Sequence, residues 1–344
     1  MALIKRKVMD VAKGLVATHE KEKSNTNTDR VVSTGSTLLD LAISGTIRRG
    51  GGIPGGILAE FFGLPMGGKT TILGEICASA QALGGFTMIG DAERRMTPEF
   101  LQYMGVKVTD DNICYPQTVK EVEDLILNTP YSDNGAIDVI AVDSVAVLMS
   151  SMEAEKEDKR GSARAKELHQ LMRKAKAVIS DKNRLIVLTN QVQDCQDVMP
   201  GQARTKTAGG HAIPFLASLR VSVTQIGKIE KKIKMGANEI KKAVGVHSLV
   251  KVIKSSIDIP YREAEIRILF NYGVDDIGSC LDYIKKISGS KSYWAVTEEF
   301  ISLEKAVKHI EENSLQSQLK ESTINLWEEV DERFRIERAP KNRG

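Results

Sequence analysis

The chain has 344 residues, of which 42% are hydrophobic and 27% charged, and its formal net charge is +3. This length allows one large domain with one or two small ones, and so modest a charge does not by itself indicate a nucleic-acid partner. Four widely spaced cysteines and the lack of an 18-residue apolar run argue against a zinc site, a disulfide framework and a membrane span. We therefore expect a cytoplasmic protein that does not contact a membrane.

Residues 1–30 predict an amphipathic helix followed by a polar linker. Apolar residues recur there at helical spacing, at Val8, Val11, Ala12, Leu15 and Val16. The stretch 20–30, EKEKSNTNTDR, is polar and suits a connector. So short a helix cannot bury its own apolar face. It packs either on its own domain or on a neighbouring subunit, and both roles remain open.

The stretch FFGLPMGGKTT, residues 61–71, fits the phosphate-binding pattern G-x-x-x-x-G-K-[ST]. The apolar run 57–62 before it suits a buried strand, and the residues after it have helical periodicity up to Gly84. A glycine loop between a strand and a helix N-terminus binds phosphate through free backbone N–H groups. The predicted nucleotide-binding residues are Gly63, Leu64, Pro65, Met66, Gly67, Gly68, Lys69, Thr70 and Thr71.

From residue 31 to 273, short apolar runs alternate with helical patterns, which is typical of an α/β fold with a mostly parallel, twisted sheet. The expected strands lie at 57–62, 86–93, 136–144, 184–191, 216–227, 248–256 and 264–273. Residues 274–334 change to short helices and one small strand, and predict a separate α+β C-terminal domain. Residues 335–344 form a basic tail.

Polar residues follow three of the predicted strands, where ligands bind in open α/β sheets. Asp143 suits the acidic position that holds Mg²⁺ through water, together with the Thr70 hydroxyl. Glu93 suits the base that activates water, and Gln191 suits a sensor of the γ-phosphate. Solvated strand ends are the alternative interpretation for Asp143 and Glu93, and Gln191 alone would carry little weight.

Two long polar segments, at about 150–166 and 191–211, predict functional loops within this domain. Cations in these segments and just beyond the first one could neutralise nucleic-acid phosphates, and they include Arg164, Lys166, Arg173, Arg204 and Lys206. Simple solvated loops are the alternative. The lysine-rich stretch 228–242 favours a solvated hairpin or a partner-binding face over a DNA contact.

Taken in order, these segments resemble the bacterial RecA recombinase family over nearly the whole chain. The resemblance rests on STGSTLLDLAI, GLPMGGKTT, DAERRMTPEF, DVIAVDSVAVL, LTNQ, TKTAGGHAIPFLASLRV and VKVIKSSIDIPYREAEIRI. It implies a RecA-like P-loop ATPase core that uses ATP and Mg²⁺. It further implies a helical filament on single-stranded DNA that pairs with a homologous duplex and exchanges strands.

The resemblance also implies roles for single residues. Lys69, Glu93, Gln191 and Lys254 would be catalytic, with Lys254 reaching the γ-phosphate on a neighbouring subunit, where Phe215 packs across the interface. Phe100 would stack on the adenine ring. The DNA-lining positions would be Lys166, His169, Arg173, Gly209 and Gly210. Of the two roles left open for the N-terminal helix, the resemblance selects docking on the adjacent subunit.

Several positions depart from the family pattern, and they indicate a divergent member such as a phage-borne one. Met66 and Gly67 replace two serines, Thr97 replaces an aspartate, Pro214 a basic residue and Ser256 a second interface lysine. The alternative function is therefore a filament-forming structural or regulatory protein that binds ATP and DNA but hydrolyses slowly. A ring-forming motor is a third possibility, against which the N-terminal helix and the C-terminal domain argue.

Overall fold

The computed structural model describes residues 30–132, 134–151, 153, 161–181, 183–194, 205–207, 212–236 and 238–338. The described residues fall into two compact units that divide between Asp276 and Ile277. The predicted N-terminal helix, and residues 339–344 of the predicted tail, lie outside the described residues. None of the described helices combines the length and the apolar character that a membrane span requires.

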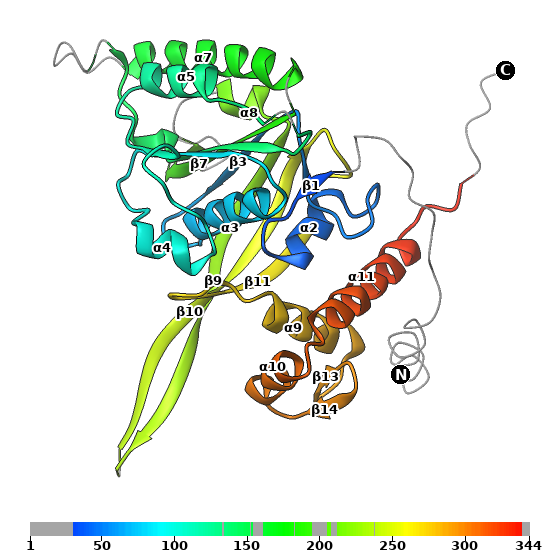
Figure 1. The fold of residues 1–344 in the computed structure, drawn as a ribbon. Coiled ribbons are helices and arrows are strands. Elements are labelled where there is room, and N and C mark those ends of the chain that lie inside the picture. Colours follow the sequence, from blue (N-terminus) through cyan, green and yellow to red (C-terminus); the bar gives the residue numbers. More distant parts are fainter. Residues whose placement is uncertain are drawn as a thin grey trace. The chain divides into compact units, whose positions relative to one another are not determined.

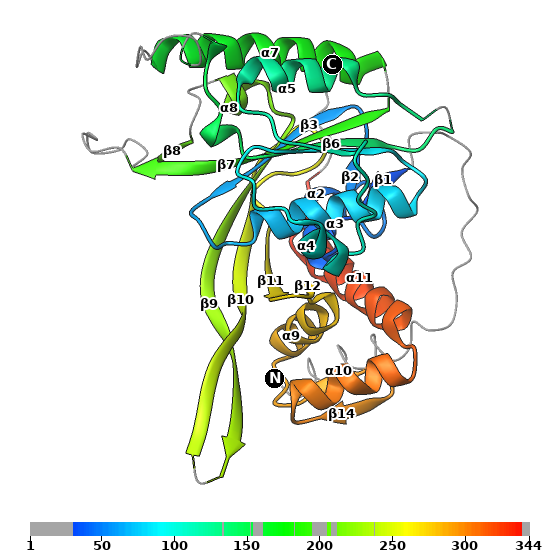
Figure 2. The ribbon, with the colours of Figure 1, turned by 60° about the vertical axis from the view of Figure 1, so that its left-hand side comes forward.

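The first unit is built on one sheet of ten strands, nine of which form a continuous path (Figures 1 and 2). From edge to edge the path is β12 (Gly273–Val274), β11 (Glu263–Leu269), β10 (Asn238–Ser255), β9 (Leu219–Met235), β3 (Ile57–Gly63), β7 (Arg184–Asp194), β6 (Asp138–Asp143), β4 (Thr87–Asp91) and β5 (Ile113–Cys114). Neighbours from β9 to β5 are parallel, and those from β9 to β12 are antiparallel. The predicted α/β fold with a mostly parallel sheet is confirmed.

Helices cover both faces of this sheet, as the burial of parallel strands requires (Figures 1 and 2). On one face lie α3 (Lys69–Ala82) and α4 (Pro98–Tyr103), and on the other α5 (Val119–Asn128), α7 (Gly161–Asp181) and α8 (Ala212–Leu216). Leucines of α7 pack with Ile140 of β6 and Leu188 of β7 in one buried cluster. Three short elements complete the unit: a small sheet of β1 (Val31–Val32) and β2 (Ile53–Pro54), the helix α2 (Thr37–Ser44) and the 3-10 turn η1 (Val145–Val147).

Both predicted loops contain more regular structure than expected. Helix α7 begins at Gly161, so residues 161–166 are helical and not part of a loop. The prediction relied on the lack of apolar periodicity, but alanine, arginine, lysine and glutamate favour a helix without it. Strand β7 continues to Asp194 and pairs with β8 (Thr205–Thr207).

Beyond the sheet, β9 and β10 continue as a two-stranded ribbon that extends away from the rest of the unit (Figures 1 and 2). The hairpin predicted for 228–242 is therefore present. The second unit contains α9 (Asp276–Ser288), β13 (Tyr293–Ala295), β14 (Glu298–Phe300), α10 (Leu303–Glu312) and α11 (Gln316–Arg333). Its own apolar core includes Leu281, Trp294, Ile310 and Leu326.

Glu75 is a largely buried carboxyl group on α3, where its Oε1 accepts a hydrogen bond of 2.9 Å from the Val274 N–H of β12. Burial raises the pKa of Glu75 to about 7, and nearby Asp276 adds to the rise. A carboxyl whose pKa is higher in the folded state makes the protein less stable as pH rises from the unfolded pKa to the folded one.

We therefore expect Glu75→Gln to stabilise the protein above pH 7 by up to about 3 kcal/mol and to flatten the loss of stability between pH 4.5 and 7. The amide oxygen of glutamine can still accept from Val274. Chemical denaturation at several pH values measures this effect. The exposed control Glu99→Gln should leave the pH profile unchanged, and a Glu75→Gln profile that follows the wild type would contradict the expectation.

Candidate nucleotide and DNA site

The segment between β3 and α3 forms a loop that only glycine permits at its two ends. A Cβ on Gly63 would lie 2.1 Å from the Val223 carbonyl oxygen, and Gly68 caps α3 with φ of +93°. Lys69 Nζ donates to the carbonyls of Gly63 and Leu64, at 3.0 and 2.9 Å, so the cation is held inside the loop. Burial lowers the pKa of Lys69, while Asp143 and Glu93 oppose the decrease.

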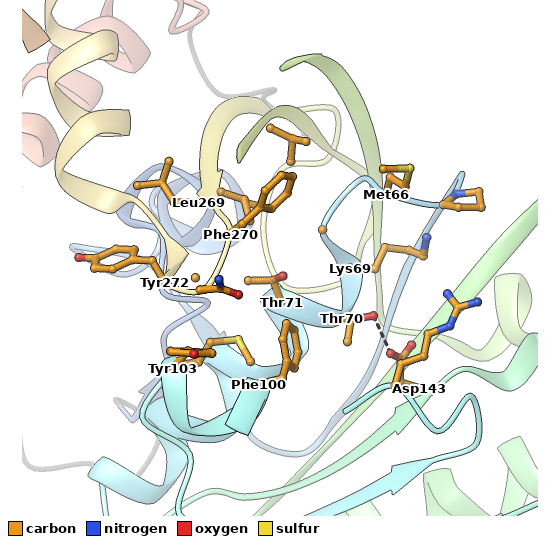
Figure 3. A pocket seen from close by; sticks show the side chains of 18 of the residues that line it. Met66, Lys69, Thr70, Thr71, Phe100, Tyr103, Asp143, Leu269, Phe270 and Tyr272 are labelled. Atoms are coloured by element: carbon orange, nitrogen blue, oxygen red, sulfur yellow. Dashed lines mark hydrogen bonds between the residues drawn. The ribbon is translucent and has the colours of Figure 1, made fainter. Parts of the chain in front are cut away.

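Asp143, at the end of β6, is buried and accepts two hydroxyl hydrogen bonds. Thr70 donates to it at 2.6 Å, and Thr189 of β7 donates to its other oxygen (Figure 3 shows the Thr70 bond). Burial raises the pKa of Asp143, whereas the two hydrogen bonds lower it. The Thr70 hydroxyl and the Asp143 carboxylate are oxygen donors, which is the ligand chemistry of Mg²⁺, and this pair therefore fits the cation.

Glu93 and Gln191 are in direct contact. Gln191 Nε2 donates to Glu93 Oε1 at 2.7 Å, and Arg95 forms an ion pair of 2.9 Å with Glu93 Oε2. The Glu93 side chain is only 7% exposed, so these two partners fix its orientation. Sequence spacing predicted both residues at strand ends, and the structure adds that one touches the other. Arg95, two residues after Glu93, was not among the predicted site residues.

A buried polar network connects Gln191 to the middle of the sheet. The Asn190 side chain accepts from the Gln191 N–H and donates to Glu60, a carboxylate of β3 with no exposed surface. Arg220 of β9 pairs with the other oxygen of Glu60, and its guanidinium lies 4.5 Å from the centre of the Phe62 ring. This network could not be predicted from local patterns, because a single Glu in an apolar strand does not reveal its partner.

A cavity of about 480 Å³ joins the phosphate loop to an aromatic end (Figure 3). Of the predicted nucleotide residues, it is lined by Pro65, Met66, Gly68, Lys69, Thr70, Thr71 and Phe100, with Glu93, Asp143 and Gln191 also on its wall. Gly63, Leu64 and Gly67 contribute to the loop without lining the cavity. The aromatic end gathers Phe100, Tyr103, Phe270 and Tyr272, whereas Lys69 and Asp143 lie at the opposite end (Figure 3).

Tyr103, Phe270 and Tyr272 are aromatic lining residues that sequence reasoning missed. Tyr103 follows Phe100 by three positions on α4, so both can lie on the same side of that helix. Phe270 and Tyr272 follow the end of β11. The rule that ligands bind at strand ends could have found the latter two, but the prediction placed residues 270–272 inside the strand.

The predicted DNA-binding residues fall into three groups. Lys166, His169 and Arg173 are exposed on α7 and line one hollow beside Gln170 and Lys174. Arg164 instead donates to the Ala146 carbonyl at 2.9 Å and is partly buried. Lys206 lies in β8, opposite Gln193 of β7, and Arg204, Gly209 and Gly210 lie outside the described residues.

The two predicted interface residues are close to each other. Lys254 Nζ donates to the carbonyls of Pro214 and Phe215, at 3.1 and 2.7 Å, so it caps the end of α8. Burial lowers the pKa of Lys254, and the positive charge of Arg220 adds to the decrease. Phe215 is 78% exposed, although phenylalanine normally avoids water, and its position suits a contact with another molecule.

Comparison with known proteins agrees with this geometry. Residues 3–275 match the family model described as the RecA N-terminal domain. Protein RecA of Thermus thermophilus is 38% identical over 254 residues, which cover 73% of this chain and 70% of that protein. Protein RecA of Caldanaerobacter subterraneus subsp. tengcongensis is 34% identical over 271 residues, 76% of this chain and 75% of that protein.

The chain belongs to the RecA family. It is thus a recombination protein of that family. The predicted family membership is confirmed, whereas the roles of single residues stay predictions.

Two of the positions that depart from the family pattern, Met66 and Gly67, lie in the phosphate loop. Met66 adopts φ of +67° and is 72% exposed, and the Gly67 carbonyl accepts a 2.8 Å hydrogen bond from Ser248 of β10.

Removing one charge of the Glu60–Arg220 pair leaves the other desolvated and without its partner. We expect Glu60→Gln to lower the free energy of unfolding by about 3 kcal/mol, which chemical denaturation measures. Arg220→Met should cost a similar amount, and the double variant should be more stable than the sum of the two losses implies. Strictly additive losses would show that the pair does not act as a unit.

Proposed function

We propose that this chain is a DNA-dependent ATPase that forms filaments on single-stranded DNA and promotes homologous pairing with duplex DNA and strand exchange. The observation that carries the proposal is the contact between Gln191 and Glu93. Glu93 is the residue proposed to activate water. Gln191 belongs to β7, and the proposed second DNA-binding loop follows that strand. ATP hydrolysis and DNA binding would thus share one structural element.

In the proposed reaction, the backbone N–H groups of the phosphate loop and Lys69 bind the β- and γ-phosphates. Thr70, and Asp143 through water, would hold Mg²⁺, which neutralises phosphate charge when bound. Glu93 Oε accepts the proton of the attacking water, while Gln191 keeps that carboxylate oriented. The base would stack in the aromatic end of the cavity, beside Phe100.

In the proposed assembly, Phe215 contacts the neighbouring protomer and Lys254 reaches toward the γ-phosphate bound there. Both lie at the end of α8, and the register of β9 and β10 sets Lys254 opposite Arg220. Since Arg220 pairs with Glu60, and Glu60 with Asn190, polar contacts run from Arg220, the residue opposite Lys254, to Gln191. Ser256 donates to the Ser218 carbonyl and brings no charge. That absence favours the alternative of a slowly hydrolysing filament protein.

The central test is ATP hydrolysis with and without single-stranded DNA for the wild type, Lys69→Ala and Glu93→Gln. Lys69→Ala should abolish nucleotide-dependent assembly, since it removes the cation of the phosphate loop. Glu93→Gln should still assemble but hydrolyse at least about a hundredfold more slowly, because the proton acceptor is lost. Normal hydrolysis by Glu93→Gln would refute the assignment of the base. DNA binding with little stimulation of the wild type would favour the slow filament protein.

A second prediction concerns the exposed cations of α7. If Arg173 contacts a phosphate, Arg173→Ala should weaken binding to single-stranded DNA and reduce the slope of log K against log salt by about 0.7. Fluorescence anisotropy at several salt concentrations measures both quantities. Lys107→Ala, which removes an exposed cation elsewhere in the same unit, is the matched control. Equal effects of the two substitutions would show that Arg173 acts only through net charge.

A further inference from the structure

The ribbon that extends from the sheet has two chemically different faces. We call residues 228–235 and 238–243 the arm. Within the described residues, 230–235 of β9 and 238–243 of β10 form strand pairs only with each other. An isolated two-stranded ribbon is marginally stable in water, so a partner that covers the arm would stabilise it.

Strand register assigns the side chains of the arm to its faces, because directly opposed residues share a face. The charged face carries Lys228, Glu230, Lys232, Lys234, Glu239 and Lys241. Its opposed lysines 232 and 241 are each neutralised, by Glu239 at 3.0 Å and by Glu230. Two of the four lysines on this face are thus neutralised within the arm.

The apolar face carries Ile229, Ile233, Met235 and Ile240, together with Lys231 and Lys242. These two lysines are directly opposed, and no acidic side chain of the described chain lies within ion-pair distance of either. Like charges in this position repel each other. Ile233, Ile240 and Met235 are 47%, 44% and 61% exposed. A partner for this face must therefore offer carboxylates beside an apolar side chain.

The second unit of the chain has exposed carboxylates beside an exposed apolar side chain. Between 277 and 338 the chain has twelve acidic and nine basic residues, whereas 228–242 has six lysines and two glutamates. Where β14 leads into α10, the exposed Glu298, Glu299 and Glu304 flank Ile301. Ile301 is 90% exposed, more than any other large apolar side chain among the described residues. We call these four residues the acidic turn.

We propose that the apolar face of the arm docks on the acidic turn of a second copy of this chain. Lys231 and Lys242 would pair with its carboxylates, while Ile233 and Ile240 cover Ile301. Nucleic acid fits this face less well, because a phosphate backbone offers no apolar surface for the isoleucines. This contact would be an additional link between protomers, and it rests on the proposed assembly of the chain into filaments.

The test is photo-crosslinking in the full-length protein with ATP, Mg²⁺ and single-stranded DNA. The photoreactive residue p-benzoylphenylalanine replaces Ile240, and ¹⁵N-labelled protein is mixed with unlabelled protein. We expect crosslinked peptides that join the arm of one isotope to residues 298–304 of the other. Crosslinks only to DNA, only within one copy or only to other segments would overturn the proposal. The same probe at Lys241, on the charged face, should give a much lower yield.

Charge exchange provides an independent readout. Lys231→Glu with Lys242→Glu should raise the protein concentration needed for assembly about tenfold, the effect expected from losing two complementary contacts. Adding Glu298→Lys and Glu304→Lys should restore assembly. The matched control, Lys232→Glu with Lys234→Glu, makes the same change of charge on the other face. Equal effects of both arm variants, or no restoration, would overturn the proposal.

Measuring DNA-stimulated hydrolysis in the same samples separates the two hypotheses. If the wild type shows stimulation but no crosslink to the acidic turn, the docking contact is wrong and the proposed function stands. If the wild type shows the crosslink without stimulation, the copies associate through the arm and the proposed ATPase function fails.

Discussion

The parallel register of the central strands is the constraint on which the candidate site depends. It sets Gly63 of β3 beside Gln191 of β7, and Asp91 of β4 beside Asp143 of β6. Because parallel strands end at the same edge of a sheet, the phosphate loop and three polar strand ends converge there. Helix α3 then begins directly above that edge, with Lys69 and Thr70 in its first turn.

Burial gives these converging groups their character. Lys69 and Asp143 are both desolvated. Burial lowers the pKa of Lys69 and raises the pKa of Asp143, so it favours the neutral form of each. Such groups are stabilised in their charged forms by a bound ligand of opposite charge, which suits a nucleotide and its cation. The same principle explains the polar contacts from Asn190 through Glu60 to Arg220, where each buried group has a partner.

Much of this site could be predicted because local patterns encode it. The glycine loop, the strand before it and the polar strand ends follow rules that act over a few residues, and Lys69, Thr70 and Asp143 line the cavity. Contacts between distant segments could not be predicted in this way. Glu60 and Arg220 are separated by 160 positions, and their pairing depends on which strands are neighbours. The bond of Arg164 to Ala146 likewise depends on where α7 begins, which the polar composition of that segment concealed.

The contact between Gln191 and Glu93 is the link through which DNA binding would be coupled to hydrolysis. The most direct test is the ratio of ATP turnover with saturating single-stranded DNA to turnover without it, compared between the wild type and Gln191→Ala. The account predicts a high ratio for the wild type and a ratio near one for the variant, with DNA still bound. A variant that retains the wild-type ratio would show that DNA binding reaches the nucleotide site by another route, and would contradict the account.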